Sequence, residues 1–333
     1  MPLITNKKEV LGIYAEAAQR KWVIPCICSE NLTTTEAILS AVKDFGENIG
    51  VHDLPITVAI TNCYPHRSQS INYTHTQKWE VGLRLFIEDL KILTSSLSPY
   101  KDLRVMLHLD HVQYDVDKAL FDWDMKQFSS IMFDASTLSF EENIKITGRF
   151  VKKHQKIIAI EGVCDEINDS GAGGNELTTP ENAEKYIRQT GCDFIVASLG
   201  TEHRANVAEM KYYGELARKI KEKIGAKIVL HGASSVNLNQ IIHLFDDGVC
   251  KVNIWTILER DSALKLFERM LCDASKIIGT QKAVDLQKQG LLGEKADINS
   301  EKSIHYYTTL YRQQIIFEEM KKIVYSFLSV WYV

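Results

Sequence analysis

The chain contains 333 residues, of which 45% are hydrophobic and 25% are charged, and its formal net charge is −4. This balance is typical of a globular protein and lacks the basic excess of surfaces that bind nucleic acids or anionic membranes. The chain has no apolar stretch of about 20 residues and no apolar signal region near its N-terminus, so we expect a cytoplasmic protein without a transmembrane helix.

Seven cysteines are scattered along the chain, and none of them forms a CxxC pair. Most lie in apolar runs, such as Cys26 and Cys28 in VIPCICSE and Cys250 in GVCKVNI. Their odd number and apolar surroundings predict reduced, buried thiols. The lack of paired spacing argues against a zinc site built from cysteines.

Eight short apolar runs, rich in β-branched residues, predict eight β-strands. In chain order they cover residues 22–27, 56–60, 104–109, 130–133, 157–161, 193–199, 227–230 and 249–254. Amphipathic segments between most of these runs predict helices. Residues 32–49 carry a threonine-based helix start, and residues 179–191 end at Gly191, which suits the C-terminal cap of a helix.

Strands that are apolar throughout and alternate with helices predict a parallel sheet that is covered on its outside. Eight such units predict an α/β protein, a (β/α)8 TIM barrel. An open doubly wound sheet is the alternative, but its dinucleotide-binding form is disfavoured because no GxGxxG follows the first run. Since no linker divides the chain, we expect residues 1–333 to form a single domain, with a C-terminal helical extension over about residues 260–333.

In a parallel barrel, the carboxyl ends of the strands form the active site. Asp110 and His111 follow the third apolar run, His203 follows the sixth, and His231 follows the seventh. Three imidazoles that converge at the mouth of a barrel suit a catalytic zinc ion with an open fourth position. A single histidine at a strand end is more often an ordinary polar loop residue, so the prediction depends on the coincidence of three.

The remaining histidines have positions that suggest structural or surface roles. His108 lies within the third run and is expected to pack in the barrel interior. His52, His66, His75 and His154 lie outside the strands, and we expect them on the surface.

Five motifs occur along the chain: HLDH (108–111), IMFDAS (131–136), SLGTEH (198–203), VLHGAS (229–234) and KVN (251–253). Their order and spacing resemble those of the zinc-dependent class II aldolases, nearest to the tagatose-bisphosphate and fructose-bisphosphate aldolase branch, over nearly the whole chain. The resemblance implies a (β/α)8 barrel that cleaves or forms a carbon–carbon bond next to a ketone, with small-molecule ketose and aldehyde substrates. It also implies one Zn²⁺ ion per subunit, with a monovalent cation as a further candidate cofactor.

The resemblance implies a role for each matching residue. His111, His203 and His231 correspond to the zinc ligands, and Asp110 corresponds to the acid/base that handles the hydroxyl proton of the cleaved carbon. The positions that hold the ketose and its phosphate are matched by Gly232, Ser234, Asn253 and Thr256. Such chemistry is reasonable on its own terms, because a zinc ion polarises a ketone and a carboxylate within hydrogen-bond reach can accept a hydroxyl proton.

Two acidic positions of the family are altered here. After the fifth run the family has two glutamates, and this chain keeps Glu161 but has Val163 in place of the second. In the lid after that run, the nearest match to the base that removes the α-proton of the substrate is Glu176. Asp165 and Glu166 are alternatives for that base, and all three acids are otherwise expected to be solvated loop residues.

Three further departures lie where the family binds its substrate. Arg204 replaces a glycine, and it either blocks the phosphate position, binds a phosphate or carboxylate, or points away into solvent. Trp255 either stacks on the substrate or packs in the core, and Cys28 stands where relatives often have asparagine. These changes predict a specificity shifted from fructose and tagatose 1,6-bisphosphate.

Two other functions remain open at this point. One is an aldolase that forms a Schiff base through Lys251 in the eighth run, and the other is a zinc-binding barrel that serves as a partner subunit or binding protein. The amphipathic, aromatic segment 304–333 is expected to pack on the barrel or on a second subunit, with a membrane-surface helix as the alternative. We therefore expect a homodimer or a higher homo-oligomer.

Overall fold

The computed structural model describes residues 3–167, 177–202 and 211–332. Its centre is a closed barrel of parallel strands in the order β1-β2-β3-β4-β5-β6-β7-β8, which confirms the predicted TIM barrel. The strands are β1 (Ile24–Cys28), β2 (Pro55–Thr61), β3 (Arg104–Gln113), β4 (Ser130–Asp134), β5 (Ala159–Val163), β6 (Phe194–Val196), β7 (Ile228–Leu230) and β8 (Val249–Ile254). Each predicted run contains one of these strands or overlaps it.

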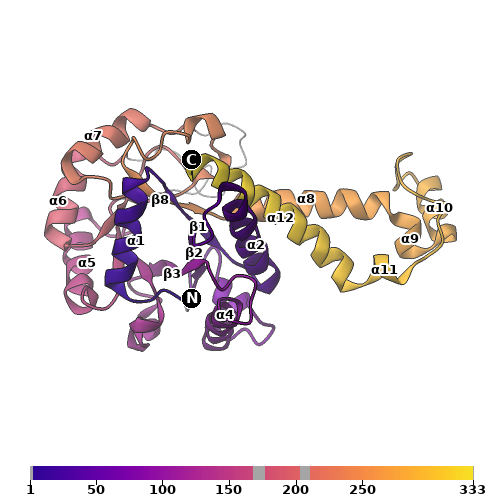
Figure 1. Cartoon of the computed structure of the whole chain (residues 1–333), viewed down its shortest axis with the longest axis horizontal. Helices are drawn as coiled ribbons and strands as arrows, with labels where there is room; N and C mark the ends of the chain where they lie inside the picture. Colours follow the sequence, from indigo (N-terminus) through magenta and orange to yellow (C-terminus); the bar gives the residue numbers. More distant parts are fainter. Residues whose placement is uncertain (1–2, 168–176, 203–210, 333) are drawn as a thin grey trace.

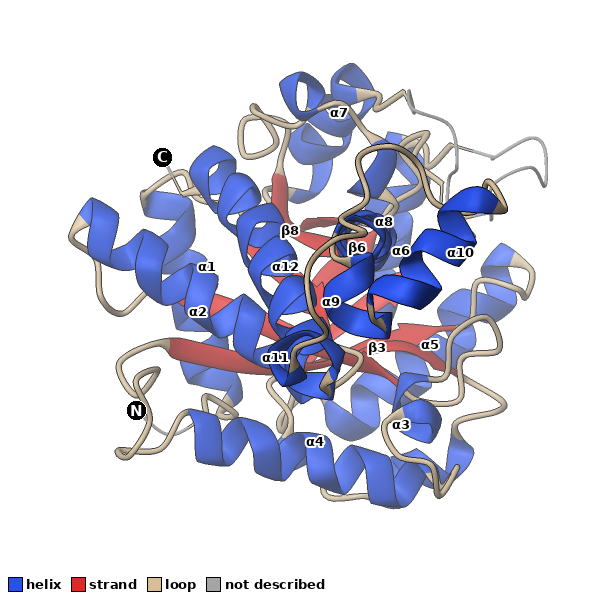
Figure 2. Cartoon of the chain, turned by 90° about the vertical axis from the view of Figure 1, so that its right-hand side faces the viewer, coloured by secondary structure: helices blue, strands red, loops and turns tan. Residues whose placement is uncertain are grey.

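Helices surround the barrel, and an apolar core fills the space between them and the strands (Figures 1 and 2). The helices of the described residues, including those that leave the barrel, are α1 (Lys7–Gln19), α2 (Leu32–Ile49), α3 (Gln69–Asn72), α4 (Trp79–Leu93), α5 (Phe140–His154), α6 (Pro180–Thr190), α7 (Gly214–Ile224), α8 (Thr256–Cys272), α9 (Ala274–Ile278), α10 (Thr280–Lys288), α11 (Ile304–Tyr307) and α12 (Thr309–Trp331). Among the described residues, no helix combines the length and the apolar character that crossing a membrane requires.

The ends of the helices show which sequence signals were correct. α6 begins where the Thr179 side chain accepts a hydrogen bond from the Asn182 backbone N–H, and it ends at Gly191 with a φ of 72°, as predicted. The threonine-based start predicted for α2 is wrong, because the capping side chain is that of Asn31, which accepts from the Thr34 N–H. Asparagine is at least as good an N-cap as threonine, so sequence alone did not separate the two.

The third strand is longer than predicted and irregular at its carboxyl end. Its register with β4 shifts between Leu109 and Val112, and His111 has a φ of 48°, in the left-handed region. In a regular strand, consecutive side chains point to opposite faces of the sheet. The shift lets Asp110 and His111, although adjacent in sequence, both line the same pocket at the mouth of the barrel.

A helical arm (residues 256–318) projects from the barrel (Figure 1). α8 leads outward, α9, α10 and α11 form the far end, and α12 returns along α8. The far end has its own small apolar cluster, built around Ala274, Ala283 and Leu292. The arm belongs to the C-terminal helical extension that the sequence predicts.

The aromatic C-terminal segment returns to the barrel. The last part of α12 packs on α2. Tyr325 meets Phe45 edge-on at 5.3 Å between ring centroids, and Tyr332 meets Trp22 at 5.0 Å. Of the alternatives for this segment, the structure therefore shows packing on the barrel for its C-terminal half.

Candidate active site

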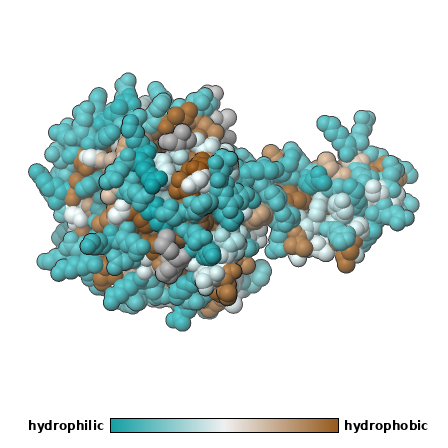
Figure 3. Space-filling model, viewed as in Figure 1, coloured by the Kyte–Doolittle hydropathy of each residue, from teal (hydrophilic) through white to brown (hydrophobic). Residues whose placement is uncertain are grey.

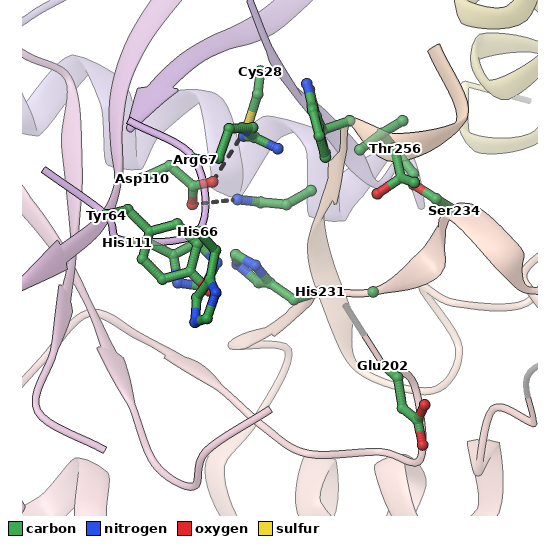
Figure 4. Close-up of a pocket in the computed structure, with 14 residues that line it drawn as sticks. Cys28, Tyr64, His66, Arg67, Asp110, His111, Glu202, His231, Ser234 and Thr256 are labelled. Atoms are coloured by element: carbon green, nitrogen blue, oxygen red, sulfur yellow. Dashed lines mark hydrogen bonds between the residues drawn. The ribbon is translucent and has the colours of Figure 1, made fainter. Parts of the chain in front are cut away.

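The carboxyl ends of the strands surround an open pocket (Figure 4). Among the described residues, its walls come from six regions: the end of β1, the loop after β2, the end of β3, Glu202 after β6, and the ends of β7 and β8. This is where a parallel barrel places its active site. The pocket contains the candidate metal and substrate residues that the structure describes.

Asp110, His111 and His231 form a buried group on one side of the pocket. One ligand atom from each residue lies within 4.8 Å of the others, and the two imidazole rings are 5.1 Å apart and nearly perpendicular. Carboxylate oxygen and imidazole nitrogen are both common ligands of zinc, so this group can hold a metal ion. His203, the third histidine predicted as a ligand, lies outside the described residues.

The ring of His111 is oriented from two sides. Its Nδ1 atom lies 3.6 Å from Oδ2 of Asp134, and its ring stacks on Tyr64 at 4.4 Å with an interplanar angle of 14°. Asp134 is itself held, because its Oδ2 accepts a hydrogen bond of 2.8 Å from the Gln113 side chain. With Nδ1 facing Asp134, Nε2 is the nitrogen left to face a metal, which is the usual arrangement of a ligating histidine.

Asp110 is a buried carboxylate with both oxygens engaged. Oδ1 accepts a hydrogen bond of 2.9 Å from the Asn253 side chain, and Oδ2 accepts one of 3.3 Å from the Cys28 thiol. Burial by itself would raise the pKa of Asp110, but the neighbouring His111, His108 and His231 together hold that pKa well below its ordinary value. Asp110 is therefore ionised and fixed in direction, as a proton acceptor requires.

Below the pocket, Lys251 lies in a fully buried ion pair. Its Nζ atom is 2.5 Å from Oε1 of Glu161 and 3.3 Å from Nε2 of His108, which contacts the Ser130 hydroxyl through its other nitrogen at 2.8 Å. Burial would lower the pKa of Lys251, but Cys26 and Glu161 raise it above its ordinary value. A charged, paired ammonium is a poor nucleophile, so this geometry does not favour the Schiff-base alternative. His108 is buried in the barrel interior, as predicted.

The predicted substrate-binding residues Gly232, Ser234, Asn253 and Thr256 all line the pocket. Gly232 has a φ of 69°, and a Cβ atom there would lie 2.7 Å from the Glu202 carbonyl oxygen, so only glycine fits. Arg204 and Glu176, predicted as a substrate-binding residue and as the lid base, lie outside the described residues.

Asp165 and Glu166, the alternatives for the lid base, lie among the described residues. Asp165 accepts a hydrogen bond of 2.7 Å from the Thr178 hydroxyl, and Glu166 is exposed. Neither of them lines the pocket. In this structure both are therefore positioned as loop acids rather than as groups that face a substrate.

The loop after β2 contributes three pocket residues that the sequence interpretation missed: Tyr64, His66 and Arg67. His66 is exposed, as predicted, but it also lines the pocket and meets Tyr64 edge-on at 5.2 Å. A position just beyond the carboxyl end of a strand is the same signal that identified Asp110 and His231. In this loop no recognisable motif accompanies that signal, so the three residues did not stand out in the sequence.

A buried carboxylate fixes the course of this loop. Asp117 accepts hydrogen bonds from the Asn62 side chain at 2.9 Å, from the Cys63 N–H at 3.0 Å and from the Gln113 N–H at 2.8 Å. It thereby ties the loop after β2 to the end of β3. The surface position predicted for His154 is wrong: its side chain is only 5% exposed, because it lies beside Phe150 on the buried face of α5.

Trp255 faces the pocket and supports a charged cluster. The Arg67 guanidinium carbon lies 3.7 Å from the centre of the Trp255 ring, and Arg67 Nε lies 3.4 Å from Oε1 of Glu30. Trp255 also packs on the small apolar cluster that contains Cys28. The sequence left open whether Trp255 faces the substrate or packs in the core. In the structure it lines the pocket and also packs on buried apolar residues.

Glu259 of α8, near Glu30 and Arg67, has a raised pKa. Burial and the nearby charge of Glu30 raise its pKa to about 7, although Arg67 opposes the shift. Between about pH 4.5 and pH 7, Glu259 keeps its proton in the folded protein but loses it in the unfolded chain. The free energy of unfolding therefore falls as the pH rises through this range.

We expect Glu259→Gln to remove that pH dependence. The free energy of unfolding of the variant minus that of the wild type should be about 1–2 kcal/mol larger at pH 8 than at pH 5. This value is smaller than the full pKa shift implies, because solvent screens a partly exposed group. Denaturant unfolding of both proteins at the two pH values measures the difference. An equal stability difference at both values would show that Glu259 titrates normally.

Comparisons with known proteins agree with the geometry of the barrel and its pocket. The family model described as fructose-bisphosphate aldolase class-II matches residues 8–309. A fructose-bisphosphate aldolase of Geobacillus stearothermophilus is 27% identical over 311 residues, which cover 89% of this chain and 97% of that protein. A fructose-bisphosphate aldolase of Giardia intestinalis is 27% identical over 193 residues, 49% of this chain and only 59% of that protein.

The crystal structure of a fructose-bisphosphate aldolase from Campylobacter jejuni has the same fold, with a TM-score of 0.69. The two chains are 20% identical, and the superposition covers 99% of this chain and 95% of that one. The family resemblance inferred from the five motifs is confirmed by the match over most of the chain. This protein belongs to the class II fructose-bisphosphate aldolase family.

Proposed function

We propose that the protein is a zinc-dependent aldolase that cleaves or forms a carbon–carbon bond next to the ketone of a phosphorylated or sugar-like ketose. The observation that carries this proposal is the buried group of Asp110, His111 and His231 at the mouth of the barrel. The imidazoles of His111 and His231 suit Zn²⁺, and His203 would supply the third imidazole of a site that keeps one position open, with Asp110 beside it.

The residues around this group have distinct roles in the proposal. His111 and His231, with His203, would hold Zn²⁺, which supplies a Lewis acid for the substrate carbonyl when it is bound. Asp110 accepts the hydroxyl proton of the scissile carbon during cleavage and returns it during synthesis. Asn253 and Cys28 engage its two oxygens and so hold it in the orientation for that transfer.

The residues after β7 and β8 form the part of the pocket that fits a phosphate. Because Gly232 has no side chain, its backbone lies close to that of Glu202 in the pocket wall. Ser234 supplies a hydroxyl, and Thr256 begins the long helix α8, whose first N–H groups attract anions. We assign the ketose phosphate to this side of the pocket. Removal of the proton on the α-carbon of the substrate is assigned to Glu176.

The assay that tests the proposal is a panel of ketose phosphates, ketose bisphosphates and acidic keto-sugars. We expect cleavage of at least one of them to be lost after treatment with a chelator and restored by added Zn²⁺. Fructose 1,6-bisphosphate should be a poor substrate, because Trp255 adds apolar bulk to the pocket wall and Arg204 replaces a glycine of the family.

Two outcomes of this assay would contradict parts of the proposal. Cleavage of fructose 1,6-bisphosphate at about 10⁴ M⁻¹s⁻¹ or above, which is in the ordinary range of enzymes, would show that specificity has not shifted. A protein that binds zinc but exchanges no proton on any ketose would instead support the alternative of a binding protein or partner subunit.

We further propose that the helical arm (residues 256–318) mediates association of two copies. Leu264, Phe267 and Leu310 on the arm are 59%, 63% and 68% exposed, and Figure 3 shows apolar residues on its surface. Large apolar side chains gathered on a projecting element are typical of an interface between proteins.

We expect the double change Leu264→Glu and Phe267→Glu to convert a dimer into a monomer, because it places two charges in the proposed interface. Size-exclusion chromatography with light scattering measures the mass of each protein. Leu97→Glu is the matched control, since Leu97 is 96% exposed in the loop after α4 and lies outside the arm. A wild type that is monomeric, or a double variant that stays dimeric, would show that the arm has another role.

A further inference from the structure

His111 lies at a point of β3 where the strand itself gives its side chain little support. The register of β3 with β4 shifts between Leu109 and Val112, and His111 has a φ of 48°. This left-handed conformation is uncommon for a residue other than glycine, and it persists only where the surrounding structure holds it. The orientation of the His111 ring therefore depends on contacts from other parts of the chain.

The contact between His111 and Asp134 does not fix the ring by itself. Nδ1 of His111 lies 3.6 Å from Oδ2 of Asp134, which is longer than a normal hydrogen bond between nitrogen and oxygen. Attraction at this distance keeps Nδ1 on the side of Asp134 but tolerates rotation about the Cβ–Cγ bond, a torsion with broad minima in histidine. A second contact is needed to set the plane of the ring.

Tyr64 supplies a flat surface against that ring. The centroids of the Tyr64 and His111 rings are 4.4 Å apart, and their planes differ by only 14°. Figure 4 shows the two rings lying together in the pocket, close to His231. Rotation of the imidazole out of this plane would bring its edge against the face of Tyr64 and lose the stacking, so the contact restricts the motion that Asp134 leaves open.

The backbone on both sides of the Tyr64 side chain is anchored. The Tyr64 carbonyl oxygen accepts hydrogen bonds from the Arg67 N–H at 3.0 Å and from the Ser68 hydroxyl at 2.9 Å. The preceding residue, Cys63, donates its N–H to the buried Asp117 carboxylate at 3.0 Å. Tyr64 is thus a fixed support and cannot simply follow a rotating imidazole.

The strand that carries His111 is joined to both of its supports. The Gln113 N–H donates to Asp117 at 2.8 Å, which ties β3 to the loop of Tyr64, and the Gln113 side chain donates to Asp134 at 2.8 Å. Gln113 is only two residues beyond His111. The ring, the stacking surface and the carboxylate therefore keep their relative positions through one short segment of β3.

We propose that Tyr64 is a positioning residue for the metal site: its ring sets the plane of the His111 imidazole and thereby slows the release of bound Zn²⁺. The proposal rests on the proposed function, in which His111 is a zinc ligand. A metal ion binds in the plane of an imidazole, so a ring that is oriented in advance loses less conformational freedom on binding. Tyr64 acts through His111 in this role and not on the reacting atoms.

The test compares the release of Zn²⁺ from the wild type, Tyr64→Leu and Tyr64→Phe. Leucine keeps apolar bulk without a flat face, whereas phenylalanine keeps the face. Each zinc-loaded protein is mixed with an excess of a chromophoric chelator, and the transfer of zinc is followed by absorbance. We expect release about 10-fold faster in Tyr64→Leu, at the lower end of the effects of removing a residue that orients a ligand. Release from Tyr64→Phe should stay within about 2-fold of the wild type.

Tyr73→Leu is the matched control, because it also removes an aromatic ring from a packed position. Tyr73 meets Phe86 edge-on at 5.8 Å and does not line the pocket. Thermal unfolding of all the variants reports the general loss of packing. Tyr73→Leu should lose stability and still release zinc at the rate of the wild type. Equal acceleration in Tyr73→Leu and Tyr64→Leu would overturn the proposal, because general loosening would then explain both.

The orientation of the ring can also be measured without metal, by nuclear magnetic resonance of histidine-labelled protein. The His111 signal is assigned by its absence from His111→Gln. Its ring protons should resonate upfield in the wild type and in Tyr64→Phe, because they lie over an aromatic face. In Tyr64→Leu the signal should broaden or split, since the ring then samples more than one plane.

Zinc release at the wild-type rate in Tyr64→Leu would overturn the proposal. Release from Tyr64→Phe as fast as from Tyr64→Leu would overturn it as well, because the hydroxyl and not the stacked ring would then hold the site. A wild type that binds no zinc would contradict the proposed function instead. The positioning of His111 is then judged by the spectra of the metal-free proteins, in which a single sharp His111 signal in Tyr64→Leu would overturn it.

Discussion

Replacing His231 by alanine is expected to remove most of the bound zinc and, with it, the aldol cleavage. A site with three imidazole ligands has no spare protein ligand, so the loss of one leaves the ion with two nitrogens. His231 is buried, and its ring lies 5.1 Å from that of His111 in the same buried group. The same result is expected for His111→Ala and His203→Ala.

Metal analysis of the purified proteins measures this effect directly. His66→Ala is a suitable control, because His66 lines the same pocket but is exposed and is not part of the buried group. The control should retain the zinc content of the wild type. Stoichiometric zinc in His231→Ala would mean that other residues hold the ion.

Asp110→Ala should leave zinc and fold in place but reduce aldol cleavage by about 10²- to 10⁴-fold, the usual size of a lost general acid or base. The structure gives the reason: Asp110 is ionised, and Asn253 and Cys28 hold its two oxygens. Steady-state kinetics on the best ketose, together with zinc content and thermal unfolding, measures the effect.

Asp110→Asn keeps the size of the side chain and one carbonyl oxygen, so it separates loss of the charge from loss of packing. It should be nearly as inactive as Asp110→Ala. Turnover like that of the wild type in both variants would remove Asp110 from the mechanism. Loss of zinc in both would instead make Asp110 a metal ligand, which its place in the buried group permits.

The barrel could be predicted from sequence because its signal is local and repeated. A strand buried on both faces is apolar at nearly every position, and all of β1, β2 and β5 is buried. His231 was found because it directly follows such a run, and the barrel itself then directs it to the mouth. No knowledge of side-chain packing was needed for that step.

The rest of the site depends on tertiary contacts that leave little trace in the sequence. Asp110 and His111 share one pocket only because β3 loses its regular register there. Arg67 reaches the pocket because Asp117, far along the chain, fixes the loop after β2. The stacking of Arg67 on Trp255 joins two loops that have no common motif, so neither residue could be assigned a neighbour in advance.

The buried pair of Lys251 and Glu161 limits how this barrel can change over evolutionary time. Loss of either partner alone would leave an uncompensated charge in the interior, which costs about 3–5 kcal/mol and is a large share of the stability of a typical domain. A pair of apolar residues of similar volume would be tolerated at the same positions. Reaching that apolar pair by single substitutions requires an intermediate with only one of the two residues replaced, and this intermediate barely folds. Substitutions can therefore accumulate at the mouth of the barrel while Lys251 and Glu161 stay unchanged.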